Sequence, residues 1–316
     1  MGASIAGVGM ALPERIVSNE QVAERLEVDA DWIAKRTGTS ERPWANPGER
    51  LSDLAADAGR LALERAGLEA GEVDLVLVAT STADEITPNA APLVAGLIGA
   101  DRAGALDVGA ACTGWLSALA MACGQIESGR AEHALVVGAD FLSRFLDFSD
   151  RDTAPLFADG AGAAVVSATE APTGRIGPIV LHSDHSGSQL IRLDRGDLIQ
   201  MDGHESFRAA VASMAQVTDE ALAASDSSAE DIDLFVYHQA NSRIISAVGQ
   251  RLGLPMDRVV DYVARFANAS TATLPIALAV AEAEGTLRRG ARVLLAAFGG
   301  GLTWGATVLE WGPSRA

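Results

Sequence analysis

A cysteine in a run of small residues is the first candidate for chemistry in this sequence. Residues 107–129 read DVGAACTGWLSALAMACGQIESG, and an apolar-periodic segment follows Cys112 at once. A helix beginning at Cys112 would aim its free N–H groups and its positive dipole end at the sulfur. That setting stabilises the thiolate and lowers the pKa of the thiol. The pattern therefore predicts a nucleophile, although a small core cysteine would also fit it.

Two other polar side chains stand where a fold would deliver them to a site. His238 ends the hydrophobic run DLFVY (233–237), and Asn268 precedes small residues and an apolar helix pattern in RFANASTATLPIALAVA (265–281). Taken alone, His238 could be structural and Asn268 a helix cap. Three glycines in AFGGGLTWG (297–305) permit close backbone approach and could present N–H groups to an oxyanion, but alone they are a weak signal.

Alternating strands and helices must position these residues. Helix patterns cover 51–67 and the segment after Cys112, and buried strand patterns are VDLVLVAT (73–80), HALVVGAD (133–140) and GAAVVSAT (162–169). This alternation predicts an α/β fold of layered helices and buried sheets. GEVDLVLVATST resembles EDIDLFVYHQAN, and EHALVVGA resembles ARVLLAAF at the same spacing. The repeat indicates two similar halves, 1–170 and 171–316, unless shared αβ patterning alone produced it.

Charge and composition exclude several kinds of partner. The chain carries 24 Lys and Arg against 42 Asp and Glu, a net charge of −18. Such a field opposes nonspecific binding to nucleic acid or to an anionic membrane. No apolar run reaches transmembrane length, and the N-terminus lacks the basic region of a signal peptide. Cys112 and Cys123 make neither a disulfide framework nor a metal cage, so we expect a reduced, cytoplasmic protein without a metal.

Together the motifs resemble the ketoacyl synthase III family of the thiolase superfamily. The resemblance covers nearly the whole chain and rests on ACTGW around Cys112, ADGAGAAVV (158–166), HQANSRII from His238 and AFGGGLTWG. It implies a thiolase-like fold in which two similar βα halves form α-β-α-β-α layers. Cysteine proteases also combine Cys with His and Asn, but their local C-G-[SA]-C-[WY] signature is absent.

The resemblance implies the activity of a β-ketoacyl-acyl carrier protein (ACP) synthase III. Cys112 would take an acyl group from acyl-coenzyme A (acyl-CoA), and the acyl-enzyme would condense with malonyl-ACP as carbon dioxide leaves. The N–H groups of Cys112 and Gly300 would form an oxyanion hole. His238, neutral and donating through Nε2, and Asn268 would stabilise the enolate. No cofactor is implied beyond the acyl-CoA substrate, and the product would begin fatty-acid or polyketide synthesis.

The same resemblance assigns binding residues. Trp32 would stack on the adenine of coenzyme A, Arg36 would meet the phosphates, and Arg151 would flank the adenine. Arg243 and Arg251 would form a local basic patch for the acidic carrier protein. The remaining tunnel residues are Gly203, His204, Phe207 and Asn241. In isolation, Trp32 would be expected to pack in a core and the arginines to face solvent.

Segment ADEITPNAAP (83–92) corresponds to the loop that, in this family, plugs the acyl pocket of a partner subunit. Thr87 stands at the plug position, so we expect a homodimer with a deep pocket for branched or medium chains. The sequence departs from the family at Ala267, where glycine often precedes the asparagine, and at His204. The alternatives are an acyltransferase with a non-malonyl acceptor and an inactive partner subunit. The presence of Cys112, His238 and Asn268 together favours condensation.

Overall fold

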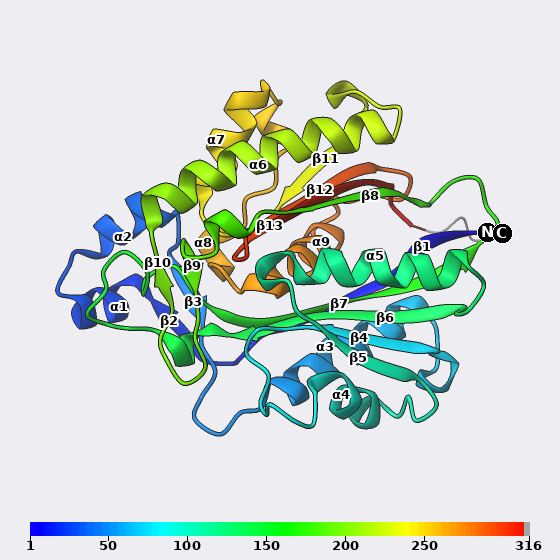
Figure 1. Ribbon diagram of the computed structural model, residues 1–316, viewed down its shortest axis with the longest axis horizontal. Coiled ribbons are helices and arrows are strands. Elements are labelled where there is room, and N and C mark those ends of the chain that lie inside the picture. The colour runs from blue at the N-terminus through cyan, green and yellow to red at the C-terminus, as the bar shows by residue number, and fades with distance from the viewer. Residues whose placement is uncertain (313–316) are drawn as a thin grey trace.

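Two β-sheets are stacked between layers of helices in the computed structural model, which describes residues 1–312 (Figure 1). The N-terminal sheet has the strand order β1-β7-β6-β4-β5, and the C-terminal sheet has the order β11-β12-β13-β8. The strands of the first sheet are β1 (Gly2–Ala11), β4 (Leu75–Ala79), β5 (Gly104–Val108), β6 (His133–Phe141) and β7 (Asp159–Thr169). Those of the second are β8 (Ile176–Ser183), β11 (Leu234–Tyr237), β12 (Arg292–Gly299) and β13 (Thr303–Glu310).

The two sheets repeat one topology, which confirms the predicted fold of two similar halves. β4 runs parallel to β6, while β6 and β7, and β7 and β1, are antiparallel. The second sheet has the same arrangement: β11 runs parallel to β12, while β12 and β13, and β13 and β8, are antiparallel. The counterpart of β5 is reduced to one bridge between Phe235 and Val259. The link from β7 to β8 spans 170–175, where the repeat places the junction of the halves.

Three helical layers enclose the sheets and confirm the expected α-β-α-β-α order (Figure 1). Between the sheets lie α5 (Gly114–Glu127) and α9 (Thr273–Ala283), and every residue of α9 from Thr273 to Ala281 is buried. A helix that is buried all round suits a position between two sheets. The outer helices are α3 (Leu51–Ala66) and α4 (Ala90–Ile98) on the first sheet, and α6 (Gly203–Ala224) and α7 (Ser242–Leu252) on the second.

The remaining elements gather at one end of the molecule, on the left in Figure 1. They are α1 (Asn19–Leu26), α2 (Ala30–Thr37), α8 (Val263–Phe266), the pair β2 (Ile16–Ser18) and β3 (Glu41–Pro43), and the hairpin β9 (Ile191–Arg192) and β10 (Gln200–Met201). Two short 3₁₀ turns lead into the central helices, Ala111–Thr113 before α5 and Ser270–Ala272 before α9.

Glycines on the strands let these two turns press against the sheets. A methyl group on Gly138 of β6 would lie 2.3 Å from the Thr271 carbonyl oxygen. A methyl group on Gly299 of β12 would lie 2.7 Å from the Cys112 backbone nitrogen. Side chains at these two positions would push the turns away, so the glycines fix where α5 and α9 begin.

Several structural absences hold for residues 1–312. No helix there is both long enough and apolar enough to cross a bilayer. No three His, Cys, Asp or Glu side chains within that range are grouped as a metal site would require. Cys112 and Cys123 are free thiols, and Cys123 is buried within α5.

Candidate active site

Both halves of the molecule contribute to one cavity of about 660 Å³. Cys112 enters it from the turn before α5, His238 from the end of β11, and Asn268 from the segment before α9. These three residues are far apart in the sequence, and the fold brings them to a common space. Their action together in one reaction stays a prediction.

Cys112 lies on the 3₁₀ turn, and α5 begins two residues later, at Gly114. The sequence pattern predicts that the helix begins at the cysteine itself. The turn is strained, because Ala111 has a φ of 44°. Gly299 makes the close backbone approach to Cys112, whereas Gly300 lies against the Ile191 carbonyl oxygen of the β9–β10 hairpin. The Gly300 N–H as part of an oxyanion hole stays a prediction.

The sequence predicts a lowered pKa for the Cys112 thiol, and the structure gives the opposite direction. Burial raises this pKa to about 11, and the negative charge of Asp140 acts in the same sense. The Ser270 hydroxyl, which donates to Sγ at 3.5 Å, acts against them. Desolvation outweighs the donor, since a buried thiolate has lost its water. The resting group is therefore a thiol, and its proton must leave during acylation.

His238 is a buried, neutral imidazole. Burial lowers its pKa to about 4, so the ring carries no charge near neutral pH, as the sequence-based prediction requires. Its Nδ1 lies 2.6 Å from Thr273 Oγ1, and the Thr273 hydroxyl donates to the Ser270 carbonyl at 3.0 Å. With the hydroxyl proton in that bond, Nδ1–H donates to Thr273 and Nε2 is an acceptor. When the hydroxyl turns to Nδ1 instead, Nε2 becomes the donor.

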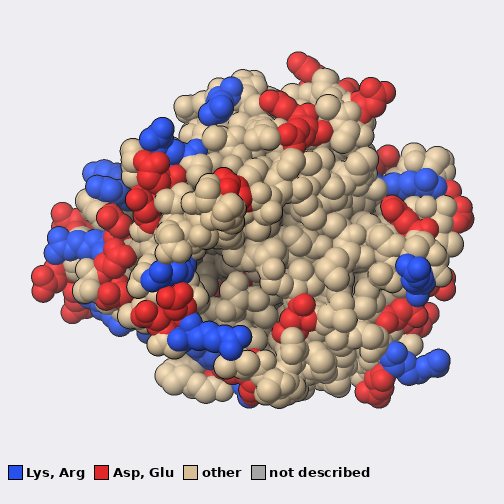
Figure 2. Space-filling view, in the orientation of Figure 1, with Lys and Arg blue, Asp and Glu red and all other residues tan. Residues whose placement is uncertain are grey.

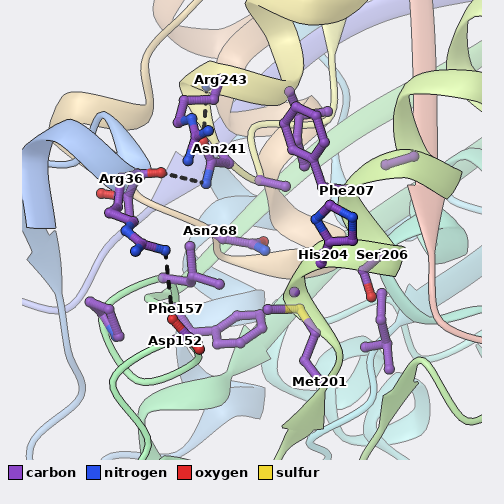
Figure 3. Close-up of a pocket in the computed structure, with 18 of the residues that line it drawn as sticks. Arg36, Asp152, Phe157, Met201, His204, Ser206, Phe207, Asn241, Arg243 and Asn268 are labelled. Carbon is purple, nitrogen blue, oxygen red and sulfur yellow. Dashed lines mark hydrogen bonds and ion pairs between the residues drawn. The ribbon is translucent and has the colours of Figure 1, made fainter.

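Asn268 presents an N–H₂ group to the cavity because its other end is occupied. Its Oδ1 accepts the Ser270 N–H at 2.9 Å. Its backbone is clamped between two bonds, N–H to the Leu156 carbonyl at 3.0 Å and C=O from the Ala158 N–H at 2.9 Å. Figure 3 shows the amide directed into the space between the lining side chains. Asn268 therefore caps a turn and offers a fixed donor at the same time.

Around the same cavity lie all seven residues that the resemblance assigns to coenzyme A, namely Trp32, Arg36, Arg151, Gly203, His204, Phe207 and Asn241. The Arg36 guanidinium lies 4.9 Å from the Trp32 ring centroid and 3.9 Å from an Asp152 oxygen (Figure 3). Asn241 Nδ2 donates to the Arg36 carbonyl at 3.1 Å, which joins α2 to the start of α7. Cations and an aromatic face are thus grouped at one cavity, as a nucleotide requires.

The residues predicted to contact the carrier protein and the partner's acyl pocket do not all line this cavity. Arg243 lines the cavity with its guanidinium 5.8 Å from the Phe207 ring centroid, but Arg251 lies outside the cavity, exposed near the end of α7. Thr87 is exposed and does not line the cavity of its own chain. The carrier-protein role of Arg243 and Arg251 and the acyl-pocket role of Thr87 stay predictions.

Two parts of the chain match models of one known protein family. Residues 106–185, which contain Cys112, match the model of 3-oxoacyl-[acyl-carrier-protein (ACP)] synthase III, and residues 222–311, which contain His238 and Asn268, match the model of its C-terminal part. The chain belongs to the 3-oxoacyl-ACP synthase III family. It is an acyltransferase of the β-ketoacyl-ACP synthase III class.

Similar proteins cover nearly the whole chain. A β-ketoacyl-[acyl-carrier-protein] synthase III from Sphingopyxis alaskensis is 44% identical over 98% of both chains. The crystal structure of 3-oxoacyl-[acyl-carrier-protein] synthase III from Aquifex aeolicus has a TM-score of 0.95 at 38% identity, covering 98% of this chain and 100% of that one. The priming β-ketosynthase of the R1128 polyketide pathway has a TM-score of 0.94 at 36% identity, covering 98% and 96%.

The sequence reasoning missed several residues that the structure brings to the site. Ser270 contacts Cys112 and Thr273 contacts His238, and both residues lie in the stretch ASTAT that follows Asn268. Their spacing from Asn268 was a usable signal, since hydroxyls in a turn often bond to neighbouring polar groups. Ile191 and Met201, from the β9–β10 hairpin, also line the cavity. Their two-residue strands carry too little pattern to be predicted.

Proposed function

We propose that this protein condenses an acyl-CoA starter with malonyl-ACP through an acyl group on Cys112, and so begins fatty-acid or polyketide synthesis. The observation that carries the proposal is the convergence of Cys112, His238 and Asn268 on one cavity, with the Asn268 amide held as a donor. An acyltransferase that uses a non-malonyl acceptor has no need of this fixed donor beside a neutral imidazole.

In the first half-reaction, Cys112 Sγ attacks the thioester carbonyl of acyl-CoA. The new C–S bond to Cys112 replaces the bond to coenzyme A, and the thiol proton finally resides on the released coenzyme A thiol. Because the pKa of Cys112 is raised to about 11, an acceptor has to carry this proton in between. The Nε2 lone pair of His238 is available in the tautomer whose Nδ1–H donates to Thr273.

In the second half-reaction, the carboxylate of malonyl-ACP leaves as carbon dioxide. The electron pair of the broken C–C bond moves onto the thioester oxygen, where His238 Nε2–H and Asn268 N–H₂ would hold it. The enolate carbon then attacks the acyl carbonyl, and Cys112 leaves as a thiolate that regains a proton. Fixed donors at developing charge contribute most in a water-poor cavity, about 3 kcal/mol each. His238 is only 3% and Asn268 only 6% exposed.

The substrates enter from the end of the molecule that carries α1, α2 and the β9–β10 hairpin. Trp32, Arg36 and Arg151, which line the cavity, provide the stacking and cationic groups for coenzyme A. Arg243 at the cavity and Arg251 in the last turn of α7 provide the positive charges for the carrier protein. Figure 2 shows basic and acidic side chains interspersed at this end. Because a net charge of −18 opposes an acidic partner at long range, Arg243 and Arg251 would have to act through local contacts with the carrier protein.

The protein acts as a homodimer in this proposal. β5 is an edge strand with one unpaired side, and Leu106 on β5, Leu97 on α4 and Met121 on α5 are 44%, 42% and 43% exposed. Figure 2 shows few charged side chains over the middle of the face that carries α5. An exposed edge and apolar side chains together favour association of two copies. Sedimentation of the wild type should give a dimer, and Leu106→Glu should give monomer; a monomeric wild type would contradict this part.

The starter is a branched or medium acyl chain, because the short side chain of Thr87 leaves room at the end of the partner's pocket. Each further buried methylene is worth about 0.8 kcal/mol. Thr87→Phe should therefore shift the preference toward acetyl-CoA. If acetyl-CoA is already the best wild-type starter and the variant behaves identically, the pocket argument fails.

Intact-mass measurement after exposure to a panel of acyl-CoAs tests the proposed intermediate. The wild type and Cys123→Ala should each gain one acyl group, and Cys112→Ala should gain none. Acylation confined to Cys123 would overturn the assignment of the nucleophile.

A further inference from the structure

Ser270 is linked by hydrogen bonds to all three proposed catalytic side chains, directly to two and through Thr273 to the third. Its hydroxyl donates to Cys112 Sγ at 3.5 Å, and its backbone N–H donates to Asn268 Oδ1 at 2.9 Å. Its carbonyl accepts the Thr273 hydroxyl, whose oxygen lies 2.6 Å from His238 Nδ1. The residue is 3% exposed. One buried serine therefore contacts the nucleophile, orients the amide and connects to the imidazole through one intervening hydroxyl.

The backbone at Ser270 is held in a conformation that serine rarely adopts. Its φ is 49°, in the left-handed region, and the turn that it begins is fastened to the N-terminal sheet. Thr271 donates its N–H and its hydroxyl to Asp140 Oδ2 at 3.1 and 2.8 Å, and the hydroxyl also contacts the Ala79 carbonyl at 3.0 Å. Unfavourable backbone conformations persist where such surroundings over-determine them, and they gather at functional sites.

The hydroxyl of Ser270 is the side-chain donor that reaches the Cys112 sulfur among residues 1–312. A hydrogen bond to a thiol is weak, whereas the same bond to a thiolate is charge-assisted and about twice as strong as a neutral one. The thiolate arises twice in a turnover, before acylation and again when Cys112 leaves the condensation product. The other titratable groups near the sulfur are Asp140, behind the turn, and His238, which lines the same cavity. Neither offers positive charge, since Asp140 is acidic and His238 is neutral.

We propose that Ser270 is a catalytic residue whose hydroxyl stabilises the Cys112 thiolate. We propose further that Thr273 is a positioning residue whose hydroxyl turns between the Ser270 carbonyl and His238 Nδ1, so that Nε2 accepts a proton in acylation and donates one in condensation. The inference rests on the proposed condensation, but each of its two parts can be tested apart from condensation. The Ser270 hydroxyl acts on the Cys112 sulfur, and Thr273 acts on the His238 imidazole.

Ser270→Ala and Ser270→Gly test the first part together. Both remove the hydroxyl and keep the backbone N–H and carbonyl that hold Asn268 and Thr273. Glycine also suits the positive φ, so agreement between the two variants separates the hydroxyl from backbone strain. Ser4→Ala, a buried serine whose hydroxyl donates to the Ser167 carbonyl far from the cavity, is the matched control.

The first readout is the rate at which iodoacetamide alkylates Cys112 across a pH series, measured in the Cys123→Ala background. We expect the alkylation rate at pH 7 to fall about tenfold in both Ser270 variants, because loss of one charge-assisted bond raises the thiol pKa by about one unit. Self-acylation by acyl-CoA should fall with it. Carbon dioxide release from malonyl-ACP by enzyme that is already acylated should stay within about twofold of wild type.

Thr273→Val should leave alkylation by iodoacetamide unchanged. It should slow both carbon dioxide release and self-acylation, in which His238 accepts the thiol proton, and Thr273→Ser should restore both rates. Wild-type alkylation profiles in both Ser270 variants would overturn the role of the hydroxyl. Equal loss of alkylation and decarboxylation in the Ser270 variants would show a merely structural role and overturn it too. A wild type that acylates but never condenses would instead overturn the proposed function, and the alkylation result would still decide the role of Ser270.

Discussion

At the scale of single residues, the side chains that we propose as catalytic are each held by one or two neighbours. His238 is kept neutral by burial and held by Thr273, and Asn268 is turned by the Ser270 N–H. Acylation needs the thiol, an oxyanion hole and a carrier for the proton. Decarboxylation needs both donors to the enolate oxygen. The two half-reactions therefore depend on these residues to different extents.

We expect His238→Ala and Asn268→Ala to lose condensation by about 10²-fold or more, the usual scale for removal of one such donor. Both variants should still form the acyl-enzyme, with His238→Ala slower because its proton acceptor is gone. Intact mass reports acylation, and formation of the β-ketoacyl product reports condensation. Unchanged condensation in both variants would contradict the assignment.

Ala267 carries strain next to Asn268. Its φ of 49° and ψ of −151° fall in a region that suits glycine, and its side chain is fully buried. Such strain costs about 1–3 kcal/mol, partly offset by the added freedom of glycine in the unfolded chain. Ala267→Gly should therefore stabilise the fold by about 1 kcal/mol in urea titration and should preserve or raise the condensation rate. A destabilised Ala267→Gly enzyme would show that the backbone is not strained there.

At the scale of elements, glycines decide how closely the turn before α9 approaches the N-terminal sheet. A methyl group at Gly138 would lie 2.3 Å from the Thr271 carbonyl, so Gly138→Ala must displace the turn that holds Ser270. We expect it to lower both stability and condensation rate. Gly96→Ala on α4 is the matched control, because no atom lies within 4 Å of the added methyl group and alanine favours a helix by about 1 kcal/mol. Equal behaviour of the two variants would contradict the packing argument.

The elements also show what the sequence could predict. The strand patterns at 73–80 and 133–140 and the helix pattern at 51–67 are confirmed. Each is a local pattern, since the two strands are continuous buried apolar runs and the helix buries one face. The short β9–β10 hairpin and the 3₁₀ turn at Cys112 have no such periodicity. The raised pKa of Cys112 depends on burial between the two halves, which no local pattern encodes. The role of Ser270 likewise depends on contacts between segments that are far apart in the chain.

At the scale of the whole molecule, a net charge of −18 opposes the approach of an acidic carrier protein. Arg251 lies outside the cavity, so its proposed contact is with the carrier rather than with coenzyme A. Arg251→Glu should lower kcat/KM for malonyl-ACP about tenfold at low salt and less at high salt, while self-acylation by acyl-CoA stays unchanged. Arg60→Glu, on α3, is the control for a simple change of net charge. A loss of equal size in both variants would show that Arg251 has no local role.

Release of carbon dioxide tests the central claim most directly, because condensation requires it and simple acyl transfer does not. The acylated enzyme should be mixed with malonyl-ACP labelled in the free carboxyl group, with Cys112→Ala as the control for background decarboxylation. We predict one labelled carbon dioxide for each β-ketoacyl product formed. Efficient self-acylation without labelled carbon dioxide, repeated across several carrier proteins, would contradict the account and support transfer to a non-malonyl acceptor.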